Sequence, residues 1–250
     1  MNALLRVGAL TFLAQCAALV TSCATAESPR AQTDASQPVD ARLDSRQDAP
    51  PPADAPPMPP MPQERTLSQT TSDVPAANNS SACNTAAGYT SEMGYYRAFK
   101  LSDVGITTAF NVTKVALGVE YAQVGSGATQ AAQIKLHTYA GTLGTATLNP
   151  AQLTLIHAAN ITIANTATPK VMEFALTKQV PAGSTLVVEL AIPNGAATST
   201  TFYIGSNNGG ESAPSYIRAA GCGQNAPTTT TAAGITGMHA IIKVTGTTVP

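Results

Sequence analysis

The sequence predicts an all-β protein, an antiparallel β-sandwich or jelly roll of about nine strands over residues 83–250. Apolar residues alternate with polar residues in several stretches of this region, the pattern of a strand with one face in a core. Clusters of Gly, Asn and Pro, such as Pro193-Asn194-Gly195, separate these stretches and are typical of turns. No long stretch has the apolar spacing of an amphipathic helix.

The N-terminus has the features of a bacterial export signal. Residues 1–22 carry one positive charge, followed by an apolar stretch from Val7 to Val20 that is too short to span a membrane. Val20-Thr21-Ser22-Cys23 resembles the lipobox of bacterial lipoproteins, and the resemblance implies cleavage before Cys23 and lipidation of its thiol. No Asp follows Cys23, which favours the outer membrane over the inner one. The alternative is ordinary cleavage after Ala26, which would give a secreted protein.

Residues 23–82 are predicted to form a lipidated N-terminus and a disordered stalk. Residues 27–82 contain eleven prolines, and residues 23–82 have eight acidic side chains against four arginines. Such a segment buries too little apolar surface to offset the entropy of ordering it. Residues 50–62 favour an extended polyproline conformation. We interpret the segment as a tether rather than as a proline-rich ligand for a recognition domain.

Period-two alternation and turn spacing predict the strands of the folded region. Along residues 110–121 the apolar positions change parity between Val112 and Val115, so a β-bulge is expected near Thr113 and Lys114. The expected strands cover residues 95–101, 110–121, 133–138, 153–163, 171–176, 186–192, 201–206, 215–219 and 239–244.

Cys83 and Cys222 are the two cysteines of the predicted domain, and export would place them in an oxidising compartment. The sequence offers no Cys-x-x-Cys or nearby His spacing of a zinc site. We therefore expect a disulfide between them. Closing such a long loop is worth about 4–5 kcal/mol in the chain-entropy treatment.

Motifs for catalysis, for a metal and for a cofactor are lacking, so none of the three is predicted. Two weaker alternatives stay open. Glu173 and Glu189 lie on polar faces of expected strands and could face each other as glycosidase carboxylates do. A metal could be held by the three histidines His137, His157 and His239. Alternatively, calcium could be held by the carboxylates of Asp103 and Glu211. A nucleic-acid partner is not expected, because the folded region has eight basic against six acidic residues and no dense basic patch.

A polar block over residues 203–218 is the candidate ligand-binding surface. Its short donors and acceptors, two tyrosines and one arginine lie close to the predicted disulfide, on loops that a rigid scaffold could hold. The alternative is a long loop that uses the same residue types for its own turns and hydrogen bonds. The candidate residues are Tyr203, Ser206, Asn207, Asn208, Glu211, Ser215, Tyr216 and Arg218.

The folded region also resembles a poorly characterised β-sandwich domain that recurs as an accessory module in secreted bacterial proteins. The resemblance covers most of residues 90–247 and implies the fold, but no established activity. It rests on the segments 95–99, 115–120, 202–207, 214–219, 222–223 and 238–239.

Three function classes follow from the sequence. The first is a non-catalytic envelope lipoprotein that displays a binding or adhesion module for a glycan or another envelope component. The chain has no Trp to stack on a sugar, so only tyrosines such as Tyr139, Tyr203 and Tyr216 could do so. The second is an assembly lipoprotein with a protein partner, and the third is a hydrolase with an unrecognised site.

Overall fold

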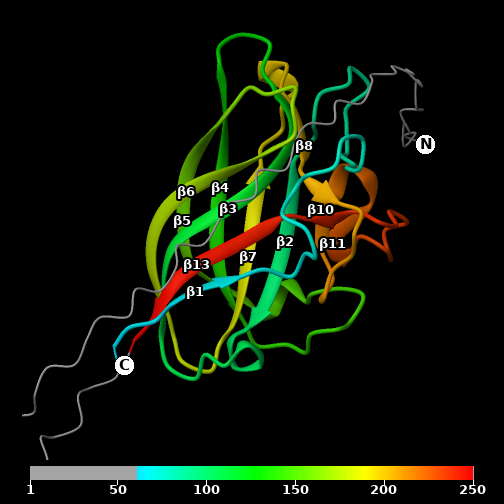
Figure 1. Ribbon diagram of the computed structural model, residues 1–250. Coiled ribbons are helices and arrows are strands. Elements are labelled where there is room, and N and C mark those ends of the chain that lie inside the picture. Colours follow the sequence, from blue (N-terminus) through cyan, green and yellow to red (C-terminus); the bar gives the residue numbers. More distant parts are fainter. Residues whose placement is uncertain (1–60, 250) are drawn as a thin grey trace, which may run out of the picture. The chain divides into compact units, whose positions relative to one another are not determined.

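The structure of the protein is a computed structural model, which describes residues 61–249. Within this range the chain is all-β, and every strand pairing is antiparallel (Figure 1). The five-stranded sheet contains β1 (Glu64–Leu67), β13 (Ile242–Thr248), β3 (Phe110–Gln123) and β6 (Lys170–Val180) in that order, with β8 (Thr201–Ile204) also paired to β3. The six-stranded sheet has the order β11 (Gln224–Thr229), β10 (Tyr216–Ala219), β2 (Met93–Lys100), β7 (Thr185–Ile192), β4 (Thr129–Tyr139) and β5 (Leu153–Ala164).

A short ladder and four 3₁₀ turns complete the described elements. β9 (Ser206–Asn207) pairs with β12 (His239–Ala240). The 3₁₀ turns are η1 (Leu101–Val104), η2 (Pro150–Gln152), η3 (Ala196–Thr198) and η4 (Ala220–Cys222).

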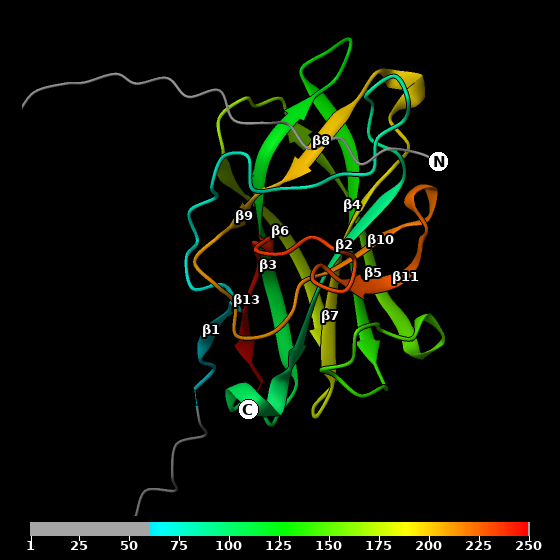
Figure 2. The same cartoon turned by 90° about the vertical axis from the view of Figure 1, so that its right-hand side faces the viewer.

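The two sheets pack face to face around one main apolar core, as the view along their edges shows (Figure 2). Tyr95 from the six-stranded sheet and Phe110, Leu117 and Phe202 from the five-stranded sheet are fully buried in it. Fully burying one side chain of this size stabilises the fold by about 1.5–3 kcal/mol. The all-β sandwich predicted from the alternation of apolar residues is therefore confirmed.

Each of the nine predicted strands has a counterpart, and the predicted bulge is present. The register of β3 against β6 shifts between Val112 and Lys114. Two predicted strands, 201–206 and 239–244, are each divided into two. The divisions fall at Gly205 and Ile241. The Ile241 N–H donates to the Gly205 carbonyl, the Gly205 N–H donates to the Gly118 carbonyl, and the Gly118 N–H donates to the Ile241 carbonyl. These bonds interrupt the two strands.

The backbones of Gly118 and Gly205 approach so closely that neither position has space for a side chain. Gly205 N–H donates to the Gly118 carbonyl over 2.8 Å, and a Cβ on Gly118 would lie 2.6 Å from the Gly205 carbonyl oxygen. Glycine is therefore required at both positions by the close approach of two strands.

The predicted boundary between stalk and domain at Cys83 is wrong, because the fold begins at Glu64 or before. Glu64 and Leu67 of β1 pair with Thr247 and Val244 of β13, and the Leu67 side chain is buried. β1 extends the five-stranded sheet at its edge (Figure 1). The sequence did not indicate this strand because three of its four side chains are exposed, so it has no apolar alternation.

Residues 68–82, which we call the strap, are also part of the domain. The backbone N–H groups of Asn78 and Asn79 donate to the carboxylate of Glu120, at 2.9 and 3.2 Å. Lys243 forms an ion pair of 2.8 Å with Asp73. Polar contacts hold this segment in place. Because its sequence has no apolar periodicity, its composition suggested a stalk. The predicted signal, Cys23, the alternative cleavage site at Ala26 and the rest of the predicted stalk lie outside the described residues.

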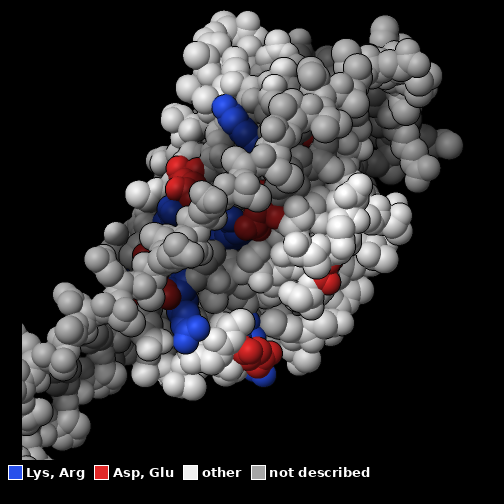
Figure 3. Space-filling view, in the orientation of Figure 1, with Lys and Arg blue, Asp and Glu red and all other residues white. Residues whose placement is uncertain are grey.

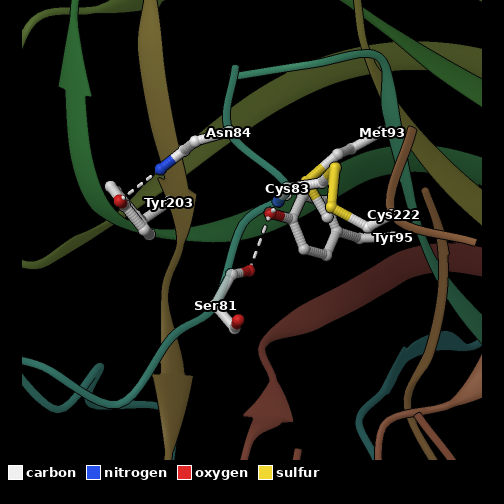
Figure 4. The surroundings of a disulfide bond; sticks show 7 residues. All are labelled: Ser81, Cys83, Asn84, Met93, Tyr95, Tyr203 and Cys222. Atoms are coloured by element: carbon white, nitrogen blue, oxygen red, sulfur yellow. Dashed lines mark hydrogen bonds between the residues drawn. A yellow bond between two sulfur atoms is a disulfide. The ribbon is translucent and has the colours of Figure 1, made fainter. Parts of the chain in front are cut away.

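The predicted disulfide is confirmed, and it joins Cys83, directly after the strap, to η4. Cys83 and Cys222 are 139 residues apart in sequence (Figure 4). Cys83 N–H donates to the Met93 sulfur over 3.0 Å, and the Tyr95 hydroxyl donates to the Ser81 carbonyl over 3.2 Å. Across residues 61–249, no helix has the length and apolar character needed to cross a membrane.

Candidate functional site

The polar block predicted as a ligand surface is largely internal. Ser206, Asn207, Ser215 and Tyr216 are at most 2 % exposed. Ser206 Oγ donates to the Asn79 carbonyl over 2.6 Å, which ties β9 to the strap. A surface ligand does not reach these four side chains, so their prediction as contact residues is corrected. Ser206, Asn207 and Ser215 instead make hydrogen bonds to the strap and to Glu211, which agrees with the structural alternative for the block.

Glu211 is the centre of a polar cluster between the sheets. Its carboxylate accepts hydrogen bonds from the Ser215 N–H and hydroxyl, the latter at 2.7 Å. It forms a 2.8 Å ion pair with Arg97 and lies 3.3 Å from His239 Nδ1. Arg97 points to the same side of β2 as the core residues Tyr95 and Phe99 and is fully buried. The cluster therefore fixes the 207–215 loop against β2.

Of the other predicted site residues, Asn208 is exposed, while Tyr203 and Arg218 are half-buried. Tyr203 accepts a 2.8 Å hydrogen bond from Asn84 beside the disulfide (Figure 4) and packs edge-on against Tyr121. Arg218 lies on β10, in the six-stranded sheet. The structure thus does not unite the predicted residues, and only Arg218 lines a sizeable hollow.

This hollow is a groove of about 460 Å³ on the outer face of the six-stranded sheet. Strand register aligns its residues in one row across the sheet: Arg218 of β10 beside Gly94, Gly94 beside Ala191, Ala191 beside Gln133, and Gln133 beside Asn160 of β5. Five strands spaced by about 4.8 Å make this row roughly 19 Å long. We call this site the groove.

The small side chains of Ala131 and Ala191 line the middle of the groove, and larger polar residues line its ends. The Tyr96 ring covers Gly94, where a Cβ would lie 2.6 Å from the Tyr96 hydroxyl. Arg218 and Glu92 line one end, and Gln133, Lys135 and Asn160 line the other end of the groove.

Glu189 lies next to this row, between Tyr96 on β2 and Lys135 on β4. His137 Nε2 is 3.0 Å from its carboxylate and Lys135 Nζ is 3.4 Å away. Burial alone would raise the pKa of the Glu189 carboxyl, but the hydrogen bond to His137 and the charge of Lys135 outweigh it, so this pKa is lowered. Glu189 is therefore a charged carboxylate in neutral solution, although it is only 4 % exposed.

The opposite end of the groove is organised by Arg218. Its Nη2 donates to Glu92 over 2.6 Å and its Nε donates to the Tyr96 hydroxyl over 3.4 Å. The hydrogen bond to Glu92 raises the pKa of the Arg218 guanidinium. Burial, followed by the charge of Glu189, raises the pKa of the Tyr96 hydroxyl, which therefore stays protonated. Within the described residues, Arg218 Nη1 has no hydrogen-bond partner.

A second, smaller hollow of about 330 Å³ lies at the far end of β3. Tyr121, Gln123 and Asn165 line it, and the Tyr121 hydroxyl bonds Gln123. The Tyr121–Tyr203 pair beside it is half-buried, unlike Tyr139 and Tyr216, which are buried. It offers fewer polar groups than the groove and has no charged lining residue.

The sequence-based alternatives for chemistry do not assemble. Glu173 is on β6 of the five-stranded sheet and Glu189 is on β7 of the six-stranded sheet, so the two carboxylates are not strand neighbours. Residues 61–249 contain no group of three or more His, Cys, Asp or Glu side chains placed to hold a metal ion. Glu189 was expected on the polar face of a strand, but the pairing of β4 with β7 brings His137 to it, and both side chains are buried.

The groove residues other than Arg218 were not predicted as a site. The alternation along the expected strands placed Gln133, Lys135 and Glu189 on their polar faces. This was the signal in the sequence that could have indicated the groove. No protein-family model, curated protein or solved structure matches the chain.

Proposed function

We propose that the protein is a non-catalytic binding module of the bacterial cell envelope, held to the membrane through Cys23, whose groove binds a glycan or another envelope component. The observation that carries the proposal is the groove itself: a hollow of about 460 Å³ on an open sheet face, lined by residues of five strands, with polar side chains at both ends. The all-β fold and the disulfide are compatible with export to an oxidising compartment.

Hydrogen-bonding capacity in the groove supports binding rather than a purely structural role. Gln133 Nε2 donates to Asn160 Oδ1 over 2.8 Å. Within residues 61–249, this leaves Gln133 Oε1, Asn160 Nδ2 and Arg218 Nη1 without partners. These atoms supply one acceptor and two kinds of donor at the surface. The buried polar groups around Glu211, by contrast, are used by internal contacts.

The test is retention of the full chain on immobilised envelope polysaccharides, peptidoglycan and outer-membrane extract. Binding to a polysaccharide or to peptidoglycan that falls at least tenfold with Arg218→Ala or Gln133→Ala supports the proposal. Lys114→Ala is the matched control, because Lys114 pairs with Glu173 on the outer face of the other sheet, where charged side chains also lie in pairs (Figure 3). Retention that the groove variants leave unchanged, or no retention, contradicts the proposal.

The anchor has a separate test. Intact mass of the membrane-extracted protein is expected to correspond to an acylated chain that begins at Cys23. An unmodified chain that begins at Glu27 contradicts the anchor and leaves the binding proposal standing.

A further inference from the structure

Charges in the groove are compensated within the protein. Arg218 pairs with Glu92 at 2.6 Å, and Lys135 pairs with Glu189 at 3.4 Å. Two cations and two carboxylates leave no net charge, so the groove has little field to attract a ligand of either sign. An anionic ligand would have to compete with Glu92 for the charge of Arg218, and a cationic ligand would have to compete with Lys135 for the charge of Glu189.

Free hydrogen-bonding positions in the groove match hydroxyl groups. A hydroxyl both donates and accepts, and Gln133 Oε1 with Asn160 Nδ2 offers one acceptor and one donor on neighbouring strands. Arg218 Nη1 offers a further donor at the opposite end of the row. The small side chains of Ala131 and Ala191 leave space between these two ends for the body of a ligand.

From these two features we infer that the groove selects an uncharged, hydroxyl-rich chain, a neutral glycan, laid across strands β10 to β5. The inference rests on the proposed function and narrows its ligand. The row of about 19 Å fits several linked sugar rings rather than one. The bound chain therefore makes contacts with both the Arg218 end and the Gln133–Asn160 end.

The experiment compares neutral oligosaccharides with oligogalacturonate of the same lengths by calorimetry on the full chain, at about 0.02 M and about 0.5 M salt. The expected result is binding of a neutral series, with affinity that rises with chain length and then levels off, and changes less than twofold with salt. Arg218→Ala and Gln133→Ala each lower it at least tenfold, whereas Tyr121→Ala beside the second hollow does not.

Glu92→Gln tests the compensation directly. This change leaves Arg218 without its carboxylate partner, so oligogalacturonate is expected to bind the variant at least fivefold more tightly at low salt, with the gain lost at high salt. Glu173→Gln, which frees Lys114 on the other sheet, is the matched control and should show no gain.

Two results overturn the inference alone. One is preferential, salt-sensitive binding of oligogalacturonate by the unmodified protein. The other is retention of an envelope protein through the groove with no carbohydrate bound, an outcome that leaves the proposed binding function intact. If the unmodified protein is retained on none of the tested materials, both the inference and the proposed function are contradicted.

Discussion

Two carboxylates in this domain each face a histidine and a cation, but they lie in different parts of the fold. Glu211 faces His239 and Arg97 between the sheets, at 3.3 and 2.8 Å. Glu189 faces His137 and Lys135 on the outer face of the six-stranded sheet, at 3.0 and 3.4 Å. The residue types are nearly the same in the two clusters. Their surroundings decide whether the cluster holds the fold together or borders the groove.

The arginines near the two clusters make this difference clear. Arg97 is fully buried, and its N–H groups donate to the carbonyl oxygens of Ala240 and Ala213 as well as to Glu211. Arg218 keeps 30 % of its side chain exposed and donates to Tyr96 and to an exposed Glu92. An arginine whose donors are used by backbone carbonyls is structural, whereas one with a free donor at the surface can bind.

The largest expected effect comes from Arg97→Met, which keeps the size of the side chain but removes its charge and donors. Glu211, whose side chain is only 13 % exposed, would lose its cation, and the Ala240 and Ala213 carbonyls would lose their partners. We expect the free energy of unfolding to fall by about 3–5 kcal/mol. Denaturant unfolding at pH 7 measures this. A fall below about 1 kcal/mol would show that the cluster is not structural.

Glu189→Gln should have a smaller effect on stability. The variant removes the charge that His137 and Lys135 face, but Lys135 is partly exposed and can turn to water. A loss of about 1–3 kcal/mol is expected, the range for disrupting a buried polar contact. The same unfolding measurement checks it. A loss equal to that of Arg97→Met would remove the distinction between the two clusters.

The pH dependence of stability sharpens this comparison. The pKa of Glu189 is lower in the fold than in the unfolded chain, so the unfolded state binds more protons at acidic pH. Its contribution is present above the unfolded value of about 4.3 and is lost as pH falls through the lower folded value. Unfolding scans from pH 7 to pH 2 should therefore show a steeper acid loss in the unmodified protein than in Glu189→Gln. Parallel curves would contradict this assignment.

The local part of this architecture follows from the sequence, and the non-local part does not. Alternation along 186–192 correctly placed Glu189 opposite the core side chains, and the parity change near Thr113 located the bulge. Arg97 shares parity with Tyr95 and Phe99, which was an unused signal of an inward-facing cation. β1 gave no signal, since a four-residue edge strand with one buried side chain has no period.

The groove depends on strand order, which no local pattern encodes. Asn160, Gln133 and Arg218 come from β5, β4 and β10, and two intervening strands, β7 and β2, bring the last of them into the same row. The polar block 203–218 looked like a surface because its side chains are small and polar. Its partners, Arg97 and the strap, are distant in sequence, so the internal use of Ser206 and Ser215 was not predictable from composition.

The smallest expected effect on stability is the most informative one. Arg218→Ala removes an ion pair whose carboxylate, Glu92, is 63 % exposed, and such pairs contribute about 0–1 kcal/mol. We therefore expect the free energy of unfolding to change by less than about 1 kcal/mol while glycan binding falls at least tenfold. Lys114→Ala should show the same small change in stability with no change in binding. If Arg218→Ala instead destabilised the domain as Arg97→Met does, Arg218 would belong with the structural arginine, and loss of binding in the variant would report unfolding rather than contact. A variant that stays folded but no longer binds separates the two roles. Its unchanged stability shows that the fold does not need the Arg218 side chain, so the loss of binding reports a lost contact with the ligand.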